Sequence, residues 1–122
     1  LLRIHNQSLI RSEIHIQLAR EKVFFDEKLY SLLTLLHEPG SVRDACERMD
    51  ISYSTIWNLI YTLESQLHEP LIIRSQGGTR GSHSELTPYG EEFLKRYARF
   101  SEETRSCSKK ILEECFGGFL NT

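Results

Sequence analysis

The chain has 122 residues, of which 39% are hydrophobic and 26% charged, and its formal net charge is -2 at pH 7. This length and composition are typical of one globular domain, alone or with an appendage, that buries a modest core. No apolar run reaches the ~18 residues of a membrane span, and the first residues lack the form of a secretory signal. We therefore expect a cytoplasmic protein without a membrane partner, and the slightly acidic balance gives no overall attraction to nucleic acid.

The first predicted element is a β-hairpin near the N-terminus. Apolar and polar residues alternate over residues 12–18, which is the pattern of a half-buried strand. A polar turn at residues 20–22 and a short apolar return strand at residues 23–25 complete the hairpin. Asp26 is a suitable N-cap for the leucine-rich helix that follows.

Two helix patterns joined by a tight turn come next. Ser41 is the expected N-cap of the first, and Asp50 occupies the turn, where aspartate tolerates a left-handed backbone better than most residues. Ser52 is the expected N-cap of the second, whose apolar residues recur at intervals of four, three and four over residues 56–67. A short strand, a glycine-rich tip at residues 76–83 and a returning strand follow. This order is typical of a helix-turn-helix with a β-hairpin wing, a unit best known for reading DNA with its second helix in the major groove.

A long final helix is predicted from Thr87-Pro88 to about Phe116, where Gly117-Gly118 stops it. Its apolar residues follow a seam with alternating spacings of four and three. A helix of about 28 residues is ~42 Å long, which exceeds what a small domain can cover. The seam therefore predicts a homodimer interface, with packing on its own domain as the alternative. Its members are Phe93, Tyr97, Phe100, Thr104, Cys107 and Ile111.

The predicted fold class is mainly α-helical with little β-structure. It is a winged helix-turn-helix with an N-terminal β-hairpin and a long C-terminal dimerisation helix. We expect residues 1–86 to form the DNA-binding domain and residues 87–122 to form the dimerisation helix with a short tail.

The candidate DNA contacts lie on the second helix of the motif, at the start of the first helix and on the wing. Asn58 can make a bidentate contact to adenine, worth roughly 1–3 kcal/mol of discrimination. Arg80 is the best candidate for a phosphate or minor-groove contact; the alternative is that the arginines only solvate the surface. Trp57 can lie against a thymine methyl group or a sugar, or be a partly buried packing residue. The full set is Arg43, Ser52, Tyr53, Ser54, Thr55, Trp57, Asn58, Arg74, Thr79 and Arg80.

No enzyme or metal site is recognisable in the sequence. There is no phosphate-binding loop and no His-Glu-x-x-His pattern, and the five histidines are scattered. Cys46, Cys107 and Cys115 are odd in number and lack the spacing of metal ligands, so we expect free thiols in a reducing compartment. We therefore expect no catalytic residue, no metal and no cofactor.

Three short motifs occur at characteristic distances from one another. They are Ile51-Ser52-Tyr53 with Trp57, then Arg74 with Gly77-Gly78 and Gly81, and finally Leu86-Thr87-x-x-Gly90. With them, residues 12–100 resemble the N-terminal domain of the molybdate-responsive ModE regulators, a winged-helix relative of the LysR-type DNA-binding domain. The resemblance implies a dimeric, sequence-specific transcription factor that binds double-stranded DNA.

The chain departs from the ModE-like pattern in three ways. Asp50 stands where such proteins usually have glycine, and Ser54 lies near a position that is often basic, so base readout is expected to differ. Full-length members carry C-terminal molybdate-binding domains, and this chain ends soon after its last helix, so we expect no oxyanion site in it.

Two alternatives to a DNA-binding regulator remain open at this point. One is a protein-interaction module on a winged-helix scaffold, which suits the net acidity and a recognition helix without Lys or Arg. The other is a thiol-based redox regulator that uses Cys107 or Cys115.

Overall fold

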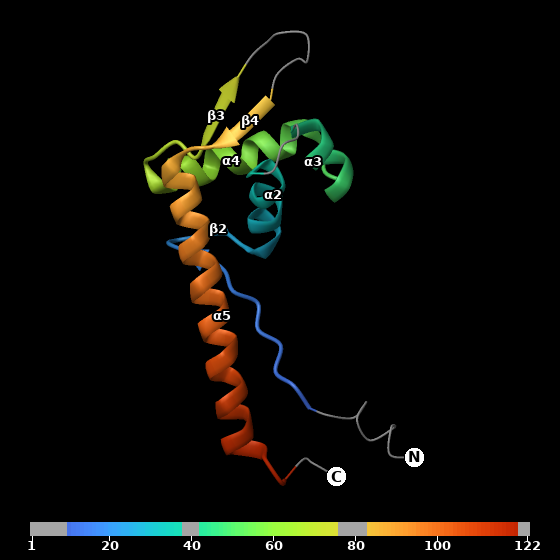
Figure 1. The fold of residues 1–122 in the computed structure, drawn as a ribbon, viewed down its shortest axis with the longest axis vertical. Helices are drawn as coiled ribbons and strands as arrows, with labels where there is room; N and C mark the ends of the chain where they lie inside the picture. Colours follow the sequence, from blue (N-terminus) through green and yellow to red (C-terminus); the bar gives the residue numbers. More distant parts are fainter. Residues whose placement is uncertain (1–9, 38–41, 76–82, 120–122) are drawn as a thin grey trace. The chain divides into compact units, whose positions relative to one another are not determined.

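The structure is a computed structural model that describes residues 10–37, 42–75 and 83–119. Its elements are β1 (Leu18–Ala19), β2 (Val23–Phe25), α2 (Glu27–His37), α3 (Val42–Met49), α4 (Tyr53–Leu67), β3 (Ile72–Ser75), β4 (His83–Leu86) and α5 (Pro88–Phe116) (Figure 1). Two compact units result: residues 16–97 form the large unit, and residues 98–119 with residues 10–15 form the small unit. Helix α5 begins in the large unit and continues into the small one.

Over the described residues, four helices are combined with two small antiparallel sheets, β1-β2 and β3-β4, which confirms the predicted mainly α-helical winged helix-turn-helix fold. Helix α3 contacts α2 and α4, while β4 contacts α2 and β2 contacts α4. The apolar face predicted for α4 is the centre of the core, since Ile56, Ile60 and Leu63 have no exposed surface. Each such side chain contributes about 1.5–3 kcal/mol by its burial. The core therefore fixes which side of α4 faces solvent.

The first turns of α5 are held in the large unit by an aromatic cluster. The Phe25 ring meets Phe93 edge-on at a centroid distance of 4.8 Å and meets Tyr97 edge-on at 4.7 Å. Tyr30 also lies against Tyr97, at 5.1 Å. The Tyr97 hydroxyl donates a 2.7 Å hydrogen bond to the carbonyl oxygen of Ile16. The cluster thus joins the N-terminal hairpin, α2 and α5.

The N-terminal hairpin exists but is shorter than predicted. The prediction of a strand over residues 12–18 is wrong except at Leu18, which pairs with Phe25 across the β1-β2 ladder. Ile16 is nevertheless buried between two exposed neighbours, so the alternation of exposure is present. The Ile16 N–H points to the Glu27 carboxylate at 3.4 Å and its carbonyl accepts from Tyr97, so its backbone groups are engaged without a neighbouring strand.

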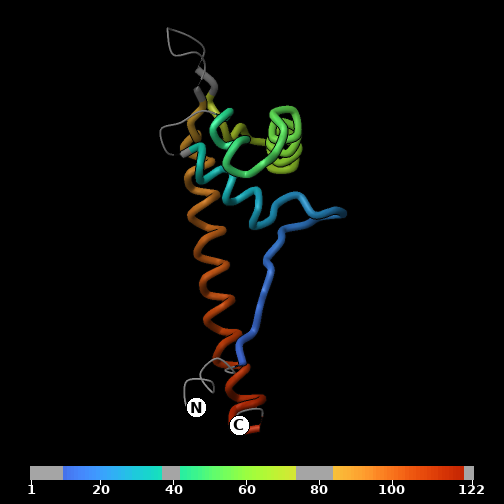
Figure 2. Tube along the Cα trace, turned by 90° about the vertical axis from the view of Figure 1, so that its right-hand side faces the viewer, coloured from blue at the N-terminus to red at the C-terminus, as the bar shows by residue number. Residues whose placement is uncertain are grey.

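Helix α5 ends at Phe116 as predicted, with Gly118 in a left-handed conformation (φ 80°) after it. In the small unit, residues 10–15 are extended and run along the C-terminal part of α5 (Figure 2). The Ser12 and Ser108 hydroxyl oxygens are 2.7 Å apart, and Arg105 donates to the carbonyl oxygen of Ile14 at 3.3 Å. None of the helices described combines the length and apolar character that a membrane span requires.

Candidate nucleic-acid interface

The turn of the helix-turn-helix is closed by backbone hydrogen bonds. The N–H of Ile51 donates to the carbonyl oxygen of Cys46 at 3.0 Å, and the N–H of Asp50 donates to that of Glu47 at 3.3 Å. Asp50 has a φ of 54°, which confirms the predicted left-handed turn residue. A residue with a side chain costs roughly 1–2 kcal/mol in this region, although aspartate adopts it more readily than most.

Ser52 caps the N-terminus of α4, as predicted. Its hydroxyl oxygen accepts the N–H of Thr55 at 3.2 Å and its hydroxyl lies 2.7 Å from the Thr55 hydroxyl, to which it donates. A serine cap of this kind is worth about 1 kcal/mol. Ser52 and Thr55, two predicted DNA contacts, are therefore hydrogen-bonded to each other in the structure.

The solvent-facing side of α4 carries several of the predicted contacts. Ser54 and Asn58 are exposed there, and Thr62 continues the same side one turn further on. Helix α4 contains no Lys or Arg, and its single charged residue is Glu64. This side of the helix can therefore interact with a ligand through hydrogen bonds and apolar contacts, and not through ion pairs.

Three aromatic side chains spaced four residues apart form a second feature of α4, called here the aromatic ladder. Its members are Tyr53, Trp57 and Tyr61. The rings of Tyr53 and Trp57 meet edge-on at 6.2 Å, and those of Trp57 and Tyr61 are stacked at 5.9 Å with an interplanar angle of 30°. The two tyrosines are about half exposed, and Trp57 is half-buried between them. Tyr61 was not among the predicted contacts, although the four-residue spacing in the sequence is a signal that identifies it.

The wing is tied to α4 by Glu64. Its carboxylate accepts the backbone N–H groups of Leu71 at 2.7 Å and Ile72 at 3.2 Å, where β3 begins. Strand β3 then pairs antiparallel with β4, from Ile72 opposite Leu86 to Ser75 opposite His83. Glu64 therefore fixes the start of the wing relative to α4.

The wing is tied in the same way to the start of α5. The Thr87 hydroxyl donates to the carbonyl oxygen of Pro70 at 2.8 Å and accepts the N–H of Gly90 at 3.0 Å, which confirms Thr87 as an N-cap. A Cβ atom on Gly90 would lie 2.7 Å from the carbonyl oxygen of Leu71. The Thr87-x-x-Gly90 motif therefore has a packing reason: only a residue without a side chain lets α5 approach β3 this closely.

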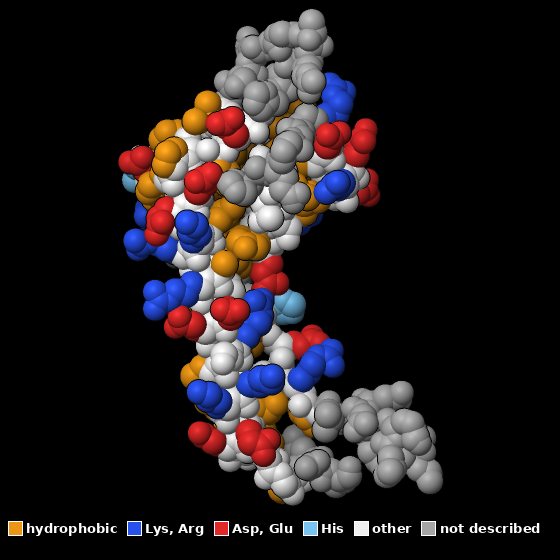
Figure 3. Space-filling view, in the orientation of Figure 1, with side chains coloured by type: hydrophobic (Ala, Val, Ile, Leu, Met, Phe, Trp, Pro, Cys, Tyr) orange, Lys and Arg blue, Asp and Glu red, His pale blue; other side chains and the backbone are white. Residues whose placement is uncertain are grey.

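The predicted basic contacts are only partly within the described residues. Arg43 is exposed in the first turn of α3. Arg74 belongs to β3, but its side chain, like Thr79 and Arg80, lies outside the described part of the structure. On the face drawn in Figure 3, the described Lys and Arg side chains are interspersed with Asp and Glu and form no continuous basic patch.

The cysteines and possible metal ligands show no assembled site. All three cysteines are free, with Cys107 and Cys115 exposed and Cys46 half-buried in α3. Burial raises the pKa of the Cys46 thiol, and the nearby charge of Arg43 opposes this only in part. Within the described ranges, no group of three His, Cys, Asp or Glu side chains is placed to hold a metal ion.

The members of the predicted dimer seam have different surroundings along α5. Phe93 and Tyr97 belong to the aromatic cluster of the large unit, where Tyr97 is buried. Further along the helix, Phe100 and Ile111 each expose about half of their surface (52% and 50%). Cys107 between them is exposed, and Thr104 is half-buried.

Comparison with known proteins places the helix-turn-helix in a family. Residues 28–91 match the family described as "Bacterial regulatory helix-turn-helix protein, lysR family". The chain is 31% identical over 90 residues to the "Molybdenum transport protein ModE" of Azotobacter vinelandii, covering 71% of this chain and 33% of that protein. It is 28% identical over 95 residues to the "Transcriptional regulator ModE" of Haemophilus influenzae, covering 78% and 37%. The chain thus spans about a third of the length of these curated relatives.

The fold also has a solved counterpart. A cysteine-to-serine mutant of Lactococcus lactis ZitR in complex with DNA is similar with a TM-score of 0.54 and 21% identity, over 92% of this chain and 77% of that one. At this identity the similarity concerns the fold alone. The family match covers more than half of the chain and includes the turn, α4 and the wing described above. The chain therefore belongs to the lysR family of bacterial regulatory helix-turn-helix proteins, and it carries the DNA-binding domain of a ModE/LysR-type transcriptional regulator.

Proposed function

We propose that the chain binds double-stranded DNA of specific sequence as a homodimer, with α4 in the major groove and the wing on the flanking backbone. The observation that carries this proposal is the exposed side of α4, where small polar side chains and Asn58 stand on a helix fixed by a buried core. A relative of this chain from Escherichia coli is named "DNA-binding transcriptional dual regulator ModE", which supports the assignment. We place the protein in the cytoplasm, where such a regulator meets its DNA.

Base recognition is assigned to the N-terminal half of α4. The Asn58 side chain is exposed there, and its amide can meet the edge of an adenine in a bidentate arrangement. In that arrangement the amide NH₂ donates to N7 of the base and the amide oxygen accepts from the N6 amino group. Ser54 and Thr55 can contact phosphates or base edges from the first turn. The N-terminal part of a recognition helix is the part that usually reaches the bases.

Backbone contacts are assigned to residues outside α4, because α4 has no cation. The candidates are Arg43 in the first turn of α3 and Arg74, Thr79 and Arg80 on the wing. Phosphate contacts of this kind supply affinity without sequence information.

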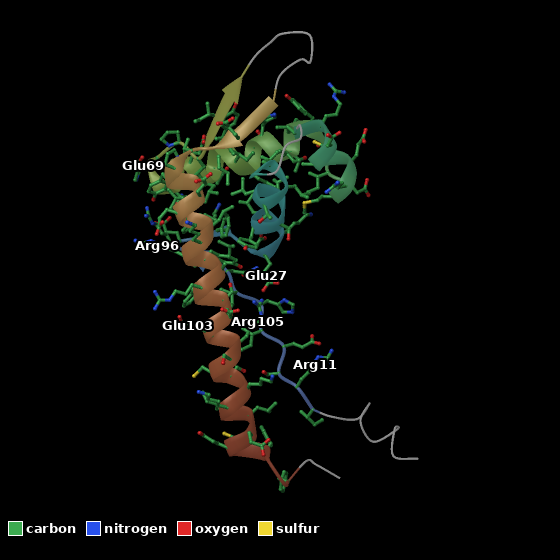
Figure 4. All side chains as sticks on the ribbon, viewed as in Figure 1. Arg11, Glu27, Glu69, Arg96, Glu103 and Arg105 are labelled. Atoms are coloured by element: carbon green, nitrogen blue, oxygen red, sulfur yellow. The ribbon has the colours of Figure 1, made fainter. Side chains whose placement is uncertain are left out.

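Dimerisation is assigned to the part of α5 beyond the large unit. Phe100, Cys107 and Ile111 lie at spacings of seven and four, so they share one face of the helix, and all three are exposed. Arg105 lies on the side of α5 that faces residues 10–15, whereas Glu103 points to the opposite side (Figure 4). Pairing through this exposed stripe would link two recognition helices, which half-sites about one helical turn apart require. Phe93 and Tyr97 then serve the core of each large unit.

The DNA proposal is tested by selecting binding sites from a random duplex library and measuring affinities for the selected operator. Asn58→Ala should lose roughly 1–3 kcal/mol of discrimination at one base pair per half-site. Gln66→Ala, which removes an amide from the C-terminal half of the same helix, is the matched control and should leave that preference intact. Equal affinity of the wild type for selected and random DNA at moderate salt would refute the proposal.

The wing contact has a different signature. Arg80→Ala should weaken binding to all sequences alike and flatten the salt dependence of the affinity by roughly one unit of slope per lost phosphate contact. Lys110→Ala, a change of charge on the exposed part of α5, is the control. An Arg80 variant that loses sequence preference while keeping the wild-type salt slope would contradict the assignment.

The dimer is tested by sedimentation velocity. Phe100→Ala should cost on the order of 3 kcal/mol per buried copy, which weakens a dimer by more than a hundredfold. Phe119→Ala is the control, because Phe119 lies after the end of α5 and is 77% exposed. A monomeric wild type, or a folded Phe100 variant that stays dimeric, would show that the stripe is not the interface.

A further inference from the structure

We infer that the aromatic ladder of α4 reads thymine methyl groups in the major groove, and that it includes Tyr61 as a specificity-determining residue. The inference rests on the proposed function, because it presumes that α4 enters the groove. It goes further by naming the chemical group that the ladder recognises and by adding a residue beyond the helix's N-terminal half.

The ladder is a continuous aromatic surface with an exposed side. The stacked Trp57 and Tyr61 rings and the edge-on Tyr53 and Trp57 rings hold one another in place. Tyr53 and Tyr61 are 51% and 48% exposed, so each presents ring surface that the protein does not cover. Because the rings are already positioned by their neighbours, they lose little side-chain freedom when a ligand covers them.

The charge distribution of α4 selects an apolar target for this surface. Glu64 is the only charged residue of the helix, and its carboxylate is engaged by two N–H groups at the start of β3. The ladder therefore has no cation on its own helix to attract phosphate. Among the groups at the base edges in the major groove, the C5-methyl of thymine is the apolar one, and aromatic side chains are among its usual contacts.

The length of the ladder lets it reach more than one base pair. The major groove of B-form DNA admits an α-helix. Tyr53 and Tyr61 are eight residues apart, which corresponds to about 12 Å along the helix axis, whereas successive base pairs are about 3.4 Å apart. Base-edge hydrogen bonding by Asn58 and methyl contacts by the ladder can then take place from the same helix, so the operator should place thymine next to the base pair that Asn58 reads.

The competing explanation is that the rings only stabilise α4 through contacts between residues four apart, which are worth a few tenths of a kcal/mol in helices. If the rings only stabilise α4, removing one of them lowers the unfolding temperature, and the affinity for DNA does not depend on a methyl group of the DNA. The test therefore changes the DNA and the protein together. Deoxyuridine is the probe, because it pairs like thymidine and lacks only the C5-methyl group.

Each thymidine of the selected operator is replaced in turn by deoxyuridine, and Kd is measured by fluorescence anisotropy. The wild type should bind about fourfold more weakly at a contacted position, the change that corresponds to ~0.8 kcal/mol for one buried methyl-sized group. For Tyr61→Ala or Tyr53→Ala, the thymidine and deoxyuridine operators should bind alike at the position that the missing ring contacts. Tyr61→Phe keeps the ring and should restore the wild-type penalty.

Tyr89→Ala is the matched control, because Tyr89 is a tyrosine of similar exposure (40%) that lies on α5. It should keep the fourfold penalty, and circular dichroism shows whether each variant is folded. A wild type that binds both operators equally overturns the inference and leaves the proposed function intact. A penalty that persists unchanged at every position in Tyr53→Ala, Trp57→Ala and Tyr61→Ala also overturns it, since another part of the protein then reads the methyl groups. If no operator can be selected at all, the proposed function itself fails.

Discussion

Replacing Gly90 by alanine should destabilise the protein, although alanine is the better helix former. In an exposed helix the substitution would gain about 1 kcal/mol. Here the new Cβ would lie 2.7 Å from the carbonyl oxygen of Leu71, an atom of the backbone and not of a flexible side chain. Overpacking of this kind typically costs about 1–3 kcal/mol. The same oxygen accepts the N–H of Thr87 at 2.9 Å, so moving it away also weakens a hydrogen bond worth about 1 kcal/mol.

The clash and the weakened hydrogen bond together exceed the gain in helix propensity, and we expect a net loss of about 2 kcal/mol. For a unit of this size the loss corresponds to a fall of roughly 10 °C in Tm. Thermal unfolding followed by circular dichroism, at one fixed protein concentration, measures it. Lys95→Ala, at an exposed position further along α5, should stay within about 0.5 kcal/mol of the wild type. A Gly90 variant with a Tm at or above that of the wild type would refute the close approach of α5 to β3.

The wing anchor, the exposed stripe of α5 and the choice of ligand can each be tested separately. Glu64→Ala should cost about 2–3 kcal/mol in urea unfolding, because two N–H groups lose a charged acceptor, whereas Glu64→Gln keeps an acceptor and should cost about half as much; equal costs would contradict this account. Ile111→Glu should dissociate the dimer in sedimentation experiments, whereas Lys110→Glu, at the neighbouring exposed position, should leave it intact; the same effect of both changes would argue against the stripe. Titration calorimetry of the 122-residue chain with molybdate should show no saturable heat, and a micromolar site would refute the expectation that this chain has no oxyanion site.

Local sequence signals predicted the helices well. Asp26, Ser52 and Thr87 each accept a backbone N–H at the start of the helix that was expected to follow them. These caps could be read from the sequence because donor and acceptor are three residues apart. The end of α5 at Phe116 was predicted for the same reason, since the glycines that stop the helix follow it directly.

Features that depend on distant partners could not be predicted in this way. The alternation over residues 12–18 correctly indicated that Ile16 is buried, but exposure alone does not say whether a neighbouring strand exists. The role of Glu64 depends on backbone groups that the chain brings to it only after α4 has ended. His68, which ends α4 with a φ of 58°, gave no sequence signal comparable to a glycine.

The assignments on the DNA-facing side stay predictions to different degrees. The structure describes the side chains of α4, and in it Asn58 is exposed whereas Trp57 is half-buried. Arg80 and Thr79 lie outside the described residues, and their role rests on the sequence. The chemistry of α4 therefore has a geometric basis, and that of the wing tip depends on the binding experiments.

The absence of Lys and Arg from α4 has a consequence for how the regulator would respond to osmotic conditions. Rising salt weakens phosphate contacts by removing the benefit of counterion release, and it does so for every DNA sequence alike. Hydrogen bonds and methyl contacts made by α4 depend much less on ionic strength. The ratio between operator and random-site affinity should then stay nearly constant while both affinities fall. Salt stress in the cell would lower the occupancy of the operator, which more protein can restore, without redirecting the regulator to other sites.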